Sequence, residues 1–185
     1  MSAIKLKVTK ASGKYDLGRS KFLGSPVMPE WMLNEFDDET IFFLQLNLEE
    51  IKDLDNENLL PHTGYLYIFL DVSSTEYSLK PIIKYTTDEP THSLDGFNDI
   101  VDGYEDFIDD YLIEFEECDD YSSGIKLFGK PNDWPFEKTD NRLVLQFDPL
   151  DSDMGIFNNL DGYIYFFFGK DNKTFKDIKI VEDVS

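Results

Sequence analysis

Few side chains in this chain have the chemistry of a nucleophile or a zinc ligand. The chain has two histidines, His62 and His92, and one cysteine, Cys118. A Ser-His-Asp arrangement would have to use one of these histidines, and the sequence contains no G-x-S-x-G elbow. Cys118 stands among acidic residues, which disfavour the thiolate that a nucleophile needs. Three such residues also fall short of the four ligands of a structural zinc site. The sequence therefore favours a protein that is not an enzyme.

Carboxylates are the other candidate metal ligands. Asp148, Asp151 and Asp153 stand close together in a turn-rich stretch, and oxygen-preferring cations such as Ca²⁺ or Mg²⁺ use such ligands. The stretch does not match the EF-hand loop, and aspartate is common in turns because its side chain bonds nearby backbone. Neither a P-loop nor a dinucleotide-binding fingerprint occurs. We therefore expect no cofactor and keep these aspartates as a weak candidate site, of which a carboxylate-metal hydrolase would be the functional consequence.

The charge of the chain restricts its partners. Against 38 Asp and Glu stand 17 Lys and Arg, so the net charge is −21. Such a field repels phosphate backbones and anionic lipid, so we expect neither nucleic acid nor a membrane as a partner. The imbalance is greatest in residues 86–124, which hold 14 acidic residues and no lysine or arginine. A basic protein is the partner that this charge attracts, and the sequence does not indicate the oligomeric state.

Cysteine usage and hydropathy indicate a compartment. One cysteine cannot form an intrachain disulfide, which fits a reducing environment. The first residues alternate apolar and basic side chains and lack the apolar core of a signal peptide. The longest apolar run, 163–168, is far too short to span a bilayer. We expect a cytoplasmic protein.

Hydrophobic alternation and abundant aromatic residues predict strands. The chain has 16 Phe and 10 Tyr, which favour pleated, half-buried surfaces. Strands are predicted at 4–8, 41–48, 65–71, 81–85, 142–148, 162–169 and 175–181.

The central acidic segment has a different period. Its apolar side chains follow helical i, i+3, i+4 spacing at Phe97, Ile100, Val101, Tyr104, Phe107, Ile108, Tyr111 and Leu112. This pattern predicts an amphipathic helix, with Asp95 as its cap and a strand beginning near Tyr111. The acidic side chains of this segment that could face a partner are Asp99, Asp102, Glu105, Asp106, Asp109, Asp110, Glu114 and Glu116.

Three sequence elements occur twice, in the same order and about 100 positions apart. They are K-x-x-G-x-P at 21–26 and 126–131, an L-Q strand at 44–47 and 145–148, and a G-Y strand at 64–70 and 162–168. We interpret the repetition as an internal duplication. The predicted fold is α+β and β-rich, with two similar β-sheet halves packed together and one acidic helix in the central connection. Residues 1–185 would form one domain from pseudo-repeats at about 20–85 and 125–181, joined by residues 86–124.

A glutamine occupies the equivalent position of the L-Q strand in each copy, at Gln45 and Gln146. A buried glutamine offers two donors and one acceptor group, so it needs partners. We favour the interpretation that both side chains bond the backbone of a neighbouring loop over the alternative that they bind a ligand.

These elements resemble the YwqG-like family, a bacterial domain of unknown function. The resemblance rests on the ordered motifs just described, together with 44–51 and the L-L-P-x-x-G run at 59–64, and covers about residues 20–180. It implies a duplicated, β-rich α+β fold. A histidine that commonly precedes the second K-x-x-G-x-P element in the family is missing here, where Gly124 and Ile125 stand. The family implies no established activity.

Two binding hypotheses follow. In the first, the acidic surface docks a basic protein, in the manner of an immunity protein that covers the basic cleft of a toxin. In the second, a cleft between the halves binds a small molecule or peptide. Its lining would include Trp31, Trp134, Gln45 and Gln146, with Tyr67 and Tyr165 as core residues or further lining.

Overall fold

The structure is a computed structural model that describes most of the chain. It describes residues 3–73, 79–132, 141–148, 150, 154, 162–169 and 177–183. In this part of the chain, no helix has both the length and the apolar character that crossing a membrane requires.

Nearly all regular structure in the described residues is β. The elements of the first half of the chain are β1 (Ala3–Lys10), β2 (Lys21–Phe22), β3 (Val27–Met28), η1 (Glu30–Met32), β4 (Thr40–Asn47), η2 (Leu48–Glu50), β5 (Tyr65–Asp71), β6 (Lys80–Thr86) and β7 (His92–Ser93). The following elements are η3 (Phe97–Ile100), η4 (Glu105–Ile108), β8 (Tyr111–Cys118), β9 (Lys126–Leu127), β10 (Leu143–Phe147), β11 (Tyr163–Phe167) and β12 (Lys179–Asp183). The strands predicted at 41–48, 65–71 and 81–85 are confirmed as β4, β5 and β6. The last described strand begins only at Lys179, later than predicted.

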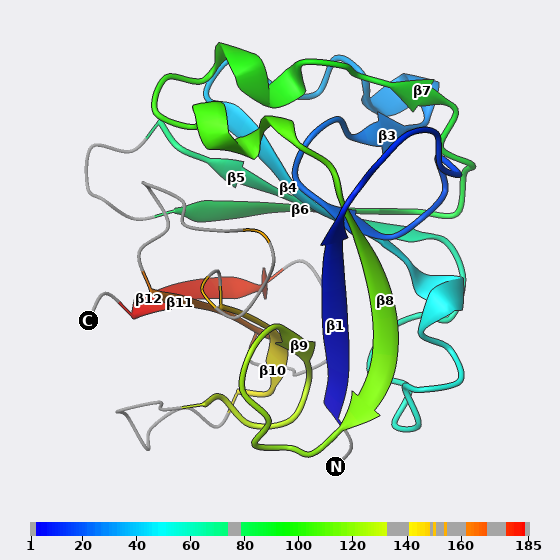
Figure 1. The fold of residues 1–185 in the computed structure, drawn as a ribbon, viewed down its shortest axis with the longest axis vertical. Helices are drawn as coiled ribbons and strands as arrows, with labels where there is room; N and C mark the ends of the chain where they lie inside the picture. The colour runs from blue at the N-terminus through cyan, green and yellow to red at the C-terminus, as the bar shows by residue number, and fades with distance from the viewer. Residues whose placement is uncertain are drawn as a thin grey trace.

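Ten strands form one antiparallel sheet whose two ends meet. The order is β12-β11-β10-β9-β1-β8-β2-β4-β5-β6, and β12 contacts β6, so the sheet almost closes into a barrel (Figure 1). At this seam the backbone N–H of Leu79 donates to Glu182 Oε1 at 2.9 Å. β3 and β7 form a separate two-stranded ribbon.

The strand order is mirrored about the central β1–β8 pair. Moving outward from β8, the chain supplies β2, β4, β5 and β6; moving outward from β1, it supplies β9, β10, β11 and β12. Each repeated sequence element therefore occupies the same place in its half: the K-x-x-G-x-P elements begin at β2 and β9, and the L-Q strands are β4 and β10. The internal duplication stays a prediction, and this mirrored order is the observation that favours it.

The K-x-x-G-x-P elements make the same turn in both halves. Leu23 and Phe128 have positive φ angles of 56° and 62°, and each is followed by a glycine that also has positive φ. Their backbone N–H groups donate to Phe43 O and Val144 O, which lie where the register shifts in β4 and β10. At Gly24 a Cβ atom would lie 2.4 Å from Asp110 Oδ1, so the close approach requires glycine.

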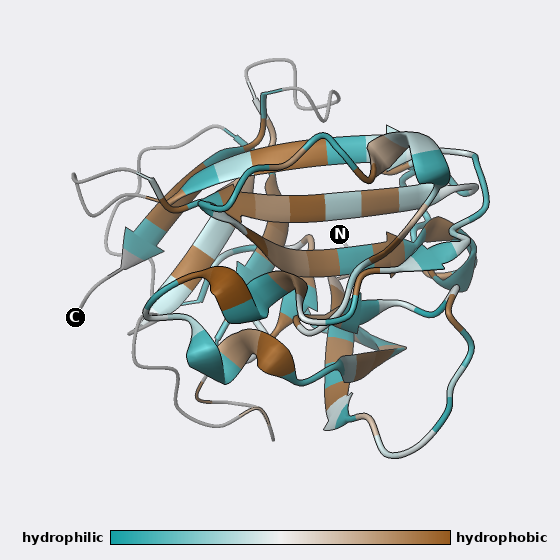
Figure 2. Ribbon diagram, turned by 90° about the horizontal axis from the view of Figure 1, so that it is seen from above, coloured by the Kyte–Doolittle hydropathy of each residue, from teal (hydrophilic) through white to brown (hydrophobic). Residues whose placement is uncertain are grey.

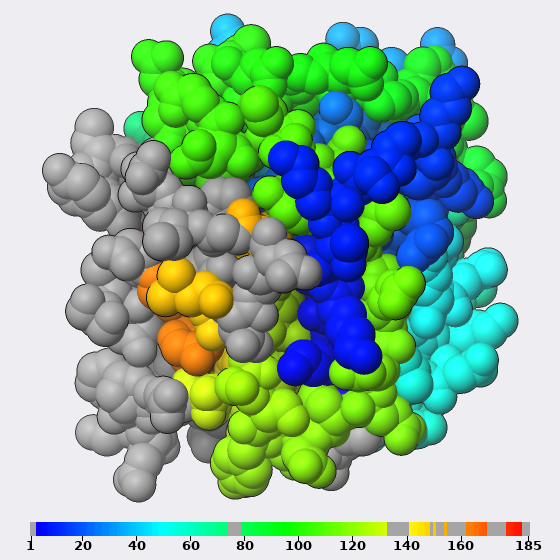
Figure 3. All heavy atoms as spheres, viewed as in Figure 1, coloured from blue at the N-terminus to red at the C-terminus, as the bar shows by residue number. Residues whose placement is uncertain are grey.

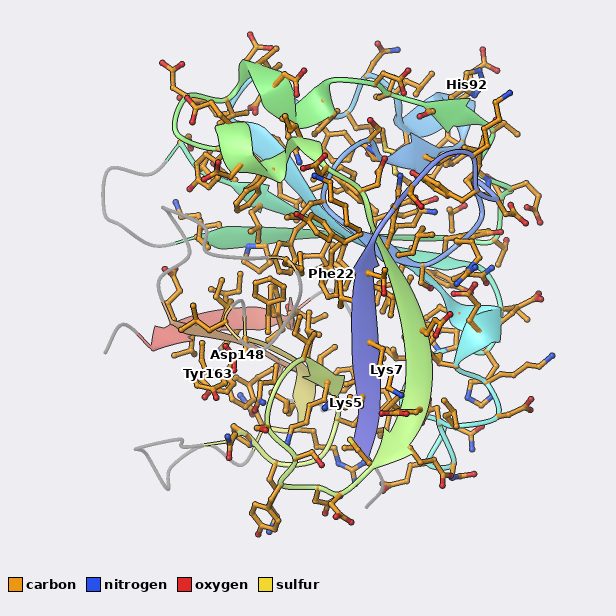
Figure 4. All side chains as sticks on the ribbon, in the orientation of Figure 1. Lys5, Lys7, Phe22, His92, Asp148 and Tyr163 are labelled. Carbon is orange, nitrogen blue, oxygen red and sulfur yellow. The ribbon has the colours of Figure 1, made fainter. Side chains whose placement is uncertain are left out.

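Aromatic rings fill the interior of the near-barrel. The ring of Phe147 lies 5.3 Å from that of Phe22 and 4.9 Å from that of Phe43, and Phe166 stacks on Phe43 at 5.6 Å. Figure 4 shows Phe22 in the middle of the molecule, between the two groups of strands. Because these rings come from both halves, the halves share one core.

A second apolar layer covers the outer face of β4 and β5. Phe42, Tyr67 and Phe69 point to this face and are buried. Phe36 stacks on Phe69 at 3.9 Å, and Met32 packs against the same cluster. The segments with η1, the β3–β7 ribbon and η3–η4 form this covering layer, seen from above in Figure 2.

The predicted α+β class and its amphipathic acidic helix are wrong. Among the described residues, the longest helical element is a 3₁₀ turn of four residues. Residues 97–108 form two such turns, η3 and η4, because Gly96 and Gly103 have φ angles of 74° and 87° and Val101 between the turns is extended. The strand expected near Tyr111 is present as β8.

The apolar residues of this segment do not share one face. Val101 and Phe107 are buried in the core, whereas Ile100 and Ile108 are 62% and 52% exposed. The apolar residues have helical spacing in the sequence, but the chain alternately enters and leaves the core, so they are not all buried.

A buried asparagine fixes the two acidic 3₁₀ turns, η3 and η4, to the sheet. Asn98 Oδ1 accepts from the backbone N–H of Phe42 at 2.7 Å. Its Nδ2 donates to Phe42 O at 3.1 Å and to Phe107 O at 3.0 Å. The side chain thereby substitutes for ladder bonds beside the register shift of β4 and joins both 3₁₀ turns.

We predict that Asn98→Ala lowers the free energy of unfolding by about 2–3 kcal/mol, because it leaves buried backbone groups of Phe42 without partners. Urea unfolding measures the loss. Asp102→Ala, an exposed change in the same segment, should alter stability by less than about 0.5 kcal/mol. Equal losses in the two variants would contradict this role of Asn98.

Candidate functional site

The acidic turns η3 and η4 form the upper surface of the molecule. The green atoms of this part of the chain line the upper edge of the space-filling view (Figure 3). Asp99, Asp102, Glu105 and Asp106 are all exposed there. Glu105 accepts a hydrogen bond from the backbone N–H of Gly103 at 3.1 Å, and backbone hydrogen bonds lower its pKa, so this carboxylate stays ionised.

Two large apolar side chains lie among these carboxylates. Ile100 ends η3 and Ile108 ends η4, and both are more than half exposed. Figure 2 shows hydrophobic and hydrophilic stretches side by side on the coiled ribbons of this layer. We call the six residues Asp99, Ile100, Asp102, Glu105, Asp106 and Ile108 the upper acidic surface. Exposed apolar side chains with charged neighbours are typical of a protein-binding surface.

Some of the acidic residues predicted to bind a partner are paired within the chain. Asp109 accepts from Lys10 Nζ at 2.5 Å, and Glu116 pairs with Lys7 Nζ at 2.5 Å. Hydrogen bonding to these carboxylates raises the pKa of both lysines. Glu114 lies opposite Lys7 in the β1–β8 register and is exposed. The lysines along β1 are visible in Figure 4. Lysines of β1 thus offset charge on β8 and at Asp109 before it, whereas Asp99, Glu105 and Asp106 of η3 and η4 are exposed.

Asp110 has a structural role. Its Oδ1 accepts from Lys21 Nζ at 2.8 Å and from the backbone N–H of Ser25 at 3.0 Å. The fully buried Lys21 also donates to Tyr15 Oη at 3.1 Å and to the carbonyl of Ser25. Burial lowers the pKa of Lys21, and the Asp110 carboxylate opposes that shift. Asp110 therefore joins the chain just before β8 to the first K-x-x-G-x-P turn.

Lys126, the counterpart of Lys21, bonds backbone carbonyls. Its Nζ donates to Asp120 O and to Lys130 O, both at 2.7 Å. The side chain is fully buried, and this burial lowers its pKa to about 8, against the opposing effect of nearby Cys118 and Asp120. In both halves, the lysine of the motif donates a hydrogen bond to the backbone carbonyl four residues further along the turn.

Gln45 bonds to neighbouring loops. Its Oε1 accepts from the backbone N–H of Val27 at 3.1 Å, and its Nε2 donates to Leu17 O and Arg19 O, both at 3.1 Å. The interpretation of this residue as a link between strand and loop is confirmed.

Gln146 makes the equivalent bonds in the second half. Its Oε1 accepts from Asn132 N at 2.7 Å, and its Nε2 donates to Gly124 O at 2.8 Å. The same interpretation is confirmed here, and these polar groups are engaged by the protein itself.

The residues proposed to line a cleft lie in different environments. Gln45, Gln146, Tyr67 and Tyr165 are fully buried, and the two tyrosine hydroxyls donate to the backbone carbonyls of Val27 and Asn132 at 2.9 and 2.6 Å. Trp31 lies at the surface on η1, while Trp134 lies outside the described residues. A hollow of about 370 Å³ lies elsewhere, beside the β11–β12 connection, and is lined by residues 169 and 177–179.

The candidate metal ligands do not form a described site. Asp148 is buried and its Oδ1 accepts from Leu150 N at 3.0 Å, while Asp151 and Asp153 lie outside the described residues. In the part of the chain that the structure describes, no three His, Cys, Asp or Glu side chains are grouped as metal ligands.

The two histidines lie apart from that stretch. His62 Nε2 lies 3.4 Å from Asp55 Oδ2, and His92 bonds Thr91 at the upper rim (Figure 4). Comparisons with known proteins add no assignment for any of these residues, since no family model matches the chain and no curated protein matches it.

Sequence reasoning missed the exposure of Ile100 and Ile108, because it assigned both to the buried face of a helix. A signal was present: Ile100 follows Asp99, and Ile108 is flanked by acidic residues within two positions on both sides.

We predict that Asp110→Asn lowers the free energy of unfolding by about 3 kcal/mol, because it leaves the buried Lys21 ammonium without its carboxylate. Chemical unfolding at pH 7 measures the effect. Asp109→Asn removes only an exposed ion pair and should cost less than about 1 kcal/mol. A loss at Asp110 as small as that at Asp109 would contradict the structural role.

We also predict a pH dependence from Lys126. Its pKa of about 8 in the folded protein lies below the ordinary lysine value of about 10.4, so the unfolded chain binds more protons between these pH values. The stability that this residue contributes must therefore rise from pH 8 to 10. The free energy of unfolding of the wild type, relative to that of Lys126→Met, should therefore increase between pH 8 and 10. A difference between the two proteins that stays constant over this range would contradict the prediction. Lys14→Met, at an exposed lysine, is the matched control.

Proposed function

We propose that this protein is a non-enzymatic binding protein whose upper acidic surface docks a basic protein. The observation that carries the proposal is the exposure of Ile100 and Ile108 among exposed carboxylates. Apolar side chains supply most of the binding energy at the centre of an interface, and the surrounding charges select the partner and raise the association rate.

Hydrogen bonds beneath the upper acidic surface support this role. Asn98 fixes η3 and η4 to β4, and Asp110, two residues after η4, is anchored through the buried Lys21. A surface whose backbone is held in place loses little conformational entropy when a partner binds.

A concrete form of this function is an immunity protein that covers the basic active cleft of a toxin. The net charge of −21 disfavours nucleic acids and anionic membranes as partners and favours such a target. A cytoplasmic location is part of the proposal, because an immunity protein must meet its toxin before the cell is damaged. Membership of the YwqG-like family is likewise a proposal, favoured by the equivalent positions of the repeated motifs in the two halves.

The test is affinity capture from the native host with the wild type and with Asp99→Asn/Asp102→Asn/Glu105→Gln/Asp106→Asn. At about 50 mM salt the wild type should retain a basic protein that is released at about 200 mM, because the Debye length falls from about 14 Å to about 7 Å between these concentrations and screens the exposed charges. The quadruple variant should retain at least about tenfold less, since it loses four negative charges where the partner binds.

The matched control is Glu49→Gln/Asp53→Asn/Glu117→Gln/Asp119→Asn. It removes the same charge from exposed residues outside η3 and η4. Capture by this control should be close to that of the wild type. Equal weakening by both variants would show that net charge alone matters and would overturn the assignment of the surface.

A further inference from the structure

An exposed tryptophan stands on the same covering layer as the upper acidic surface. Trp31 lies on η1 and is 48% exposed. Its indole Nε1 donates to Asp88 Oδ2 at 3.0 Å, and this bond joins η1 to the segment that follows β6. The indole is therefore oriented by a carboxylate while about half of its surface faces solvent.

The core does not require this ring. Two residues that follow Trp31 pack instead: Met32 is fully buried in the cluster over β4 and β5, and Phe36 stacks on Phe69 at 3.9 Å. These two side chains supply the apolar contact between this loop and the sheet. Large exposed aromatic side chains that are not needed for packing are typical anchors of binding surfaces.

The surroundings of the indole carry negative charge. Glu30, Asp88 and Glu89 are exposed, and Glu89 accepts from Tyr65 Oη at 3.3 Å. Lys84 on β6 is paired with Glu35. Its Nζ also lies 5.9 Å from the centre of the Phe36 ring, so a lysine already contacts an aromatic ring in this layer.

We propose that Trp31 is a binding site for an arginine or lysine side chain of the basic partner. The cation would lie over the exposed indole face, where the ring quadrupole attracts it and the carboxylates of Glu30, Asp88 and Glu89 complete its counter-charge. This inference rests on the proposed function and deepens it, because it specifies a second contact and the chemistry of the group that makes it. A neutral apolar side chain of the partner would gain no binding energy from these carboxylates.

The test uses the fluorescence of Trp31 in the full chain with Trp134→Phe, which leaves one tryptophan. The probe is an arginine-rich nonapeptide, compared at low and moderate salt with a peptide in which glutamine replaces each arginine. Binding at Trp31 predicts a saturable fluorescence change with the arginine peptide alone, which weakens as salt rises.

Variants measured by calorimetry separate this inference from the proposed function. Trp31→Ala should weaken binding of the arginine peptide about fivefold, and Trp31→Phe should give an intermediate affinity because phenylalanine retains a weaker quadrupole. Trp31→Phe also keeps the test valid if Trp31→Ala fails to fold.

The inference is overturned if the arginine peptide binds Trp31→Ala as tightly as it binds the wild type and leaves the fluorescence of Trp31 in the Trp134→Phe chain unchanged. The proposed function survives that result when the quadruple amide variant of the upper acidic surface still binds the peptide more weakly. A peptide that binds the wild type and that quadruple variant equally, with no response at Trp31, overturns both.

Discussion

The ammonium group of Lys21 has no contact with water, so oxygen atoms of the protein must replace its hydration. They come from Tyr15, from the Ser25 carbonyl and from the Asp110 carboxylate. Satisfying one buried cation thus fixes the first motif turn, the preceding loop and the start of β8 at one point. The second half meets the same demand with the carbonyls of Asp120 and Lys130. Two buried lysines therefore hold the turns on either side of the central β1–β8 pair.

This constraint also determines the form of the acidic segment. With Asp110 bound to Lys21, and Asn98 bonded to β4 and to Phe107 O, the chain between them is fixed at both ends. Between these anchors the chain forms two separate 3₁₀ turns, and Val101 and Phe107 are both buried in the core. The acidic and isoleucine side chains that cannot enter the core are left on the outer surface. The candidate binding surface is thus a consequence of how the sheet is tied together.

Much of the sheet could be predicted from sequence, because strand signals are local: alternation identified β1, and aromatic runs identified β4, β5 and β11. The role of Gln45 was predictable as well, since a buried amide in a strand must find partners. The helix was predicted wrongly because a 3.6-residue period records which residues are apolar and not whether each is buried. Gly96 and Gly103 adopt positive φ, and no periodicity measure registers that. The exposure of Trp31 depends on Met32 and Phe36 satisfying the core first, which only the packed structure shows.

Hydrogen–deuterium exchange on the complex with the captured basic partner would locate the surface that the partner binds. New protection is expected at residues 97–108 and around Trp31, with the backbone of the central β1–β8 pair unchanged because it is already bonded in the sheet. Protection confined to the β6–β12 seam or to the motif turns, with residues 97–108 exchanging as in the free protein, would contradict this expectation. The partner would then bind a surface other than the acidic one.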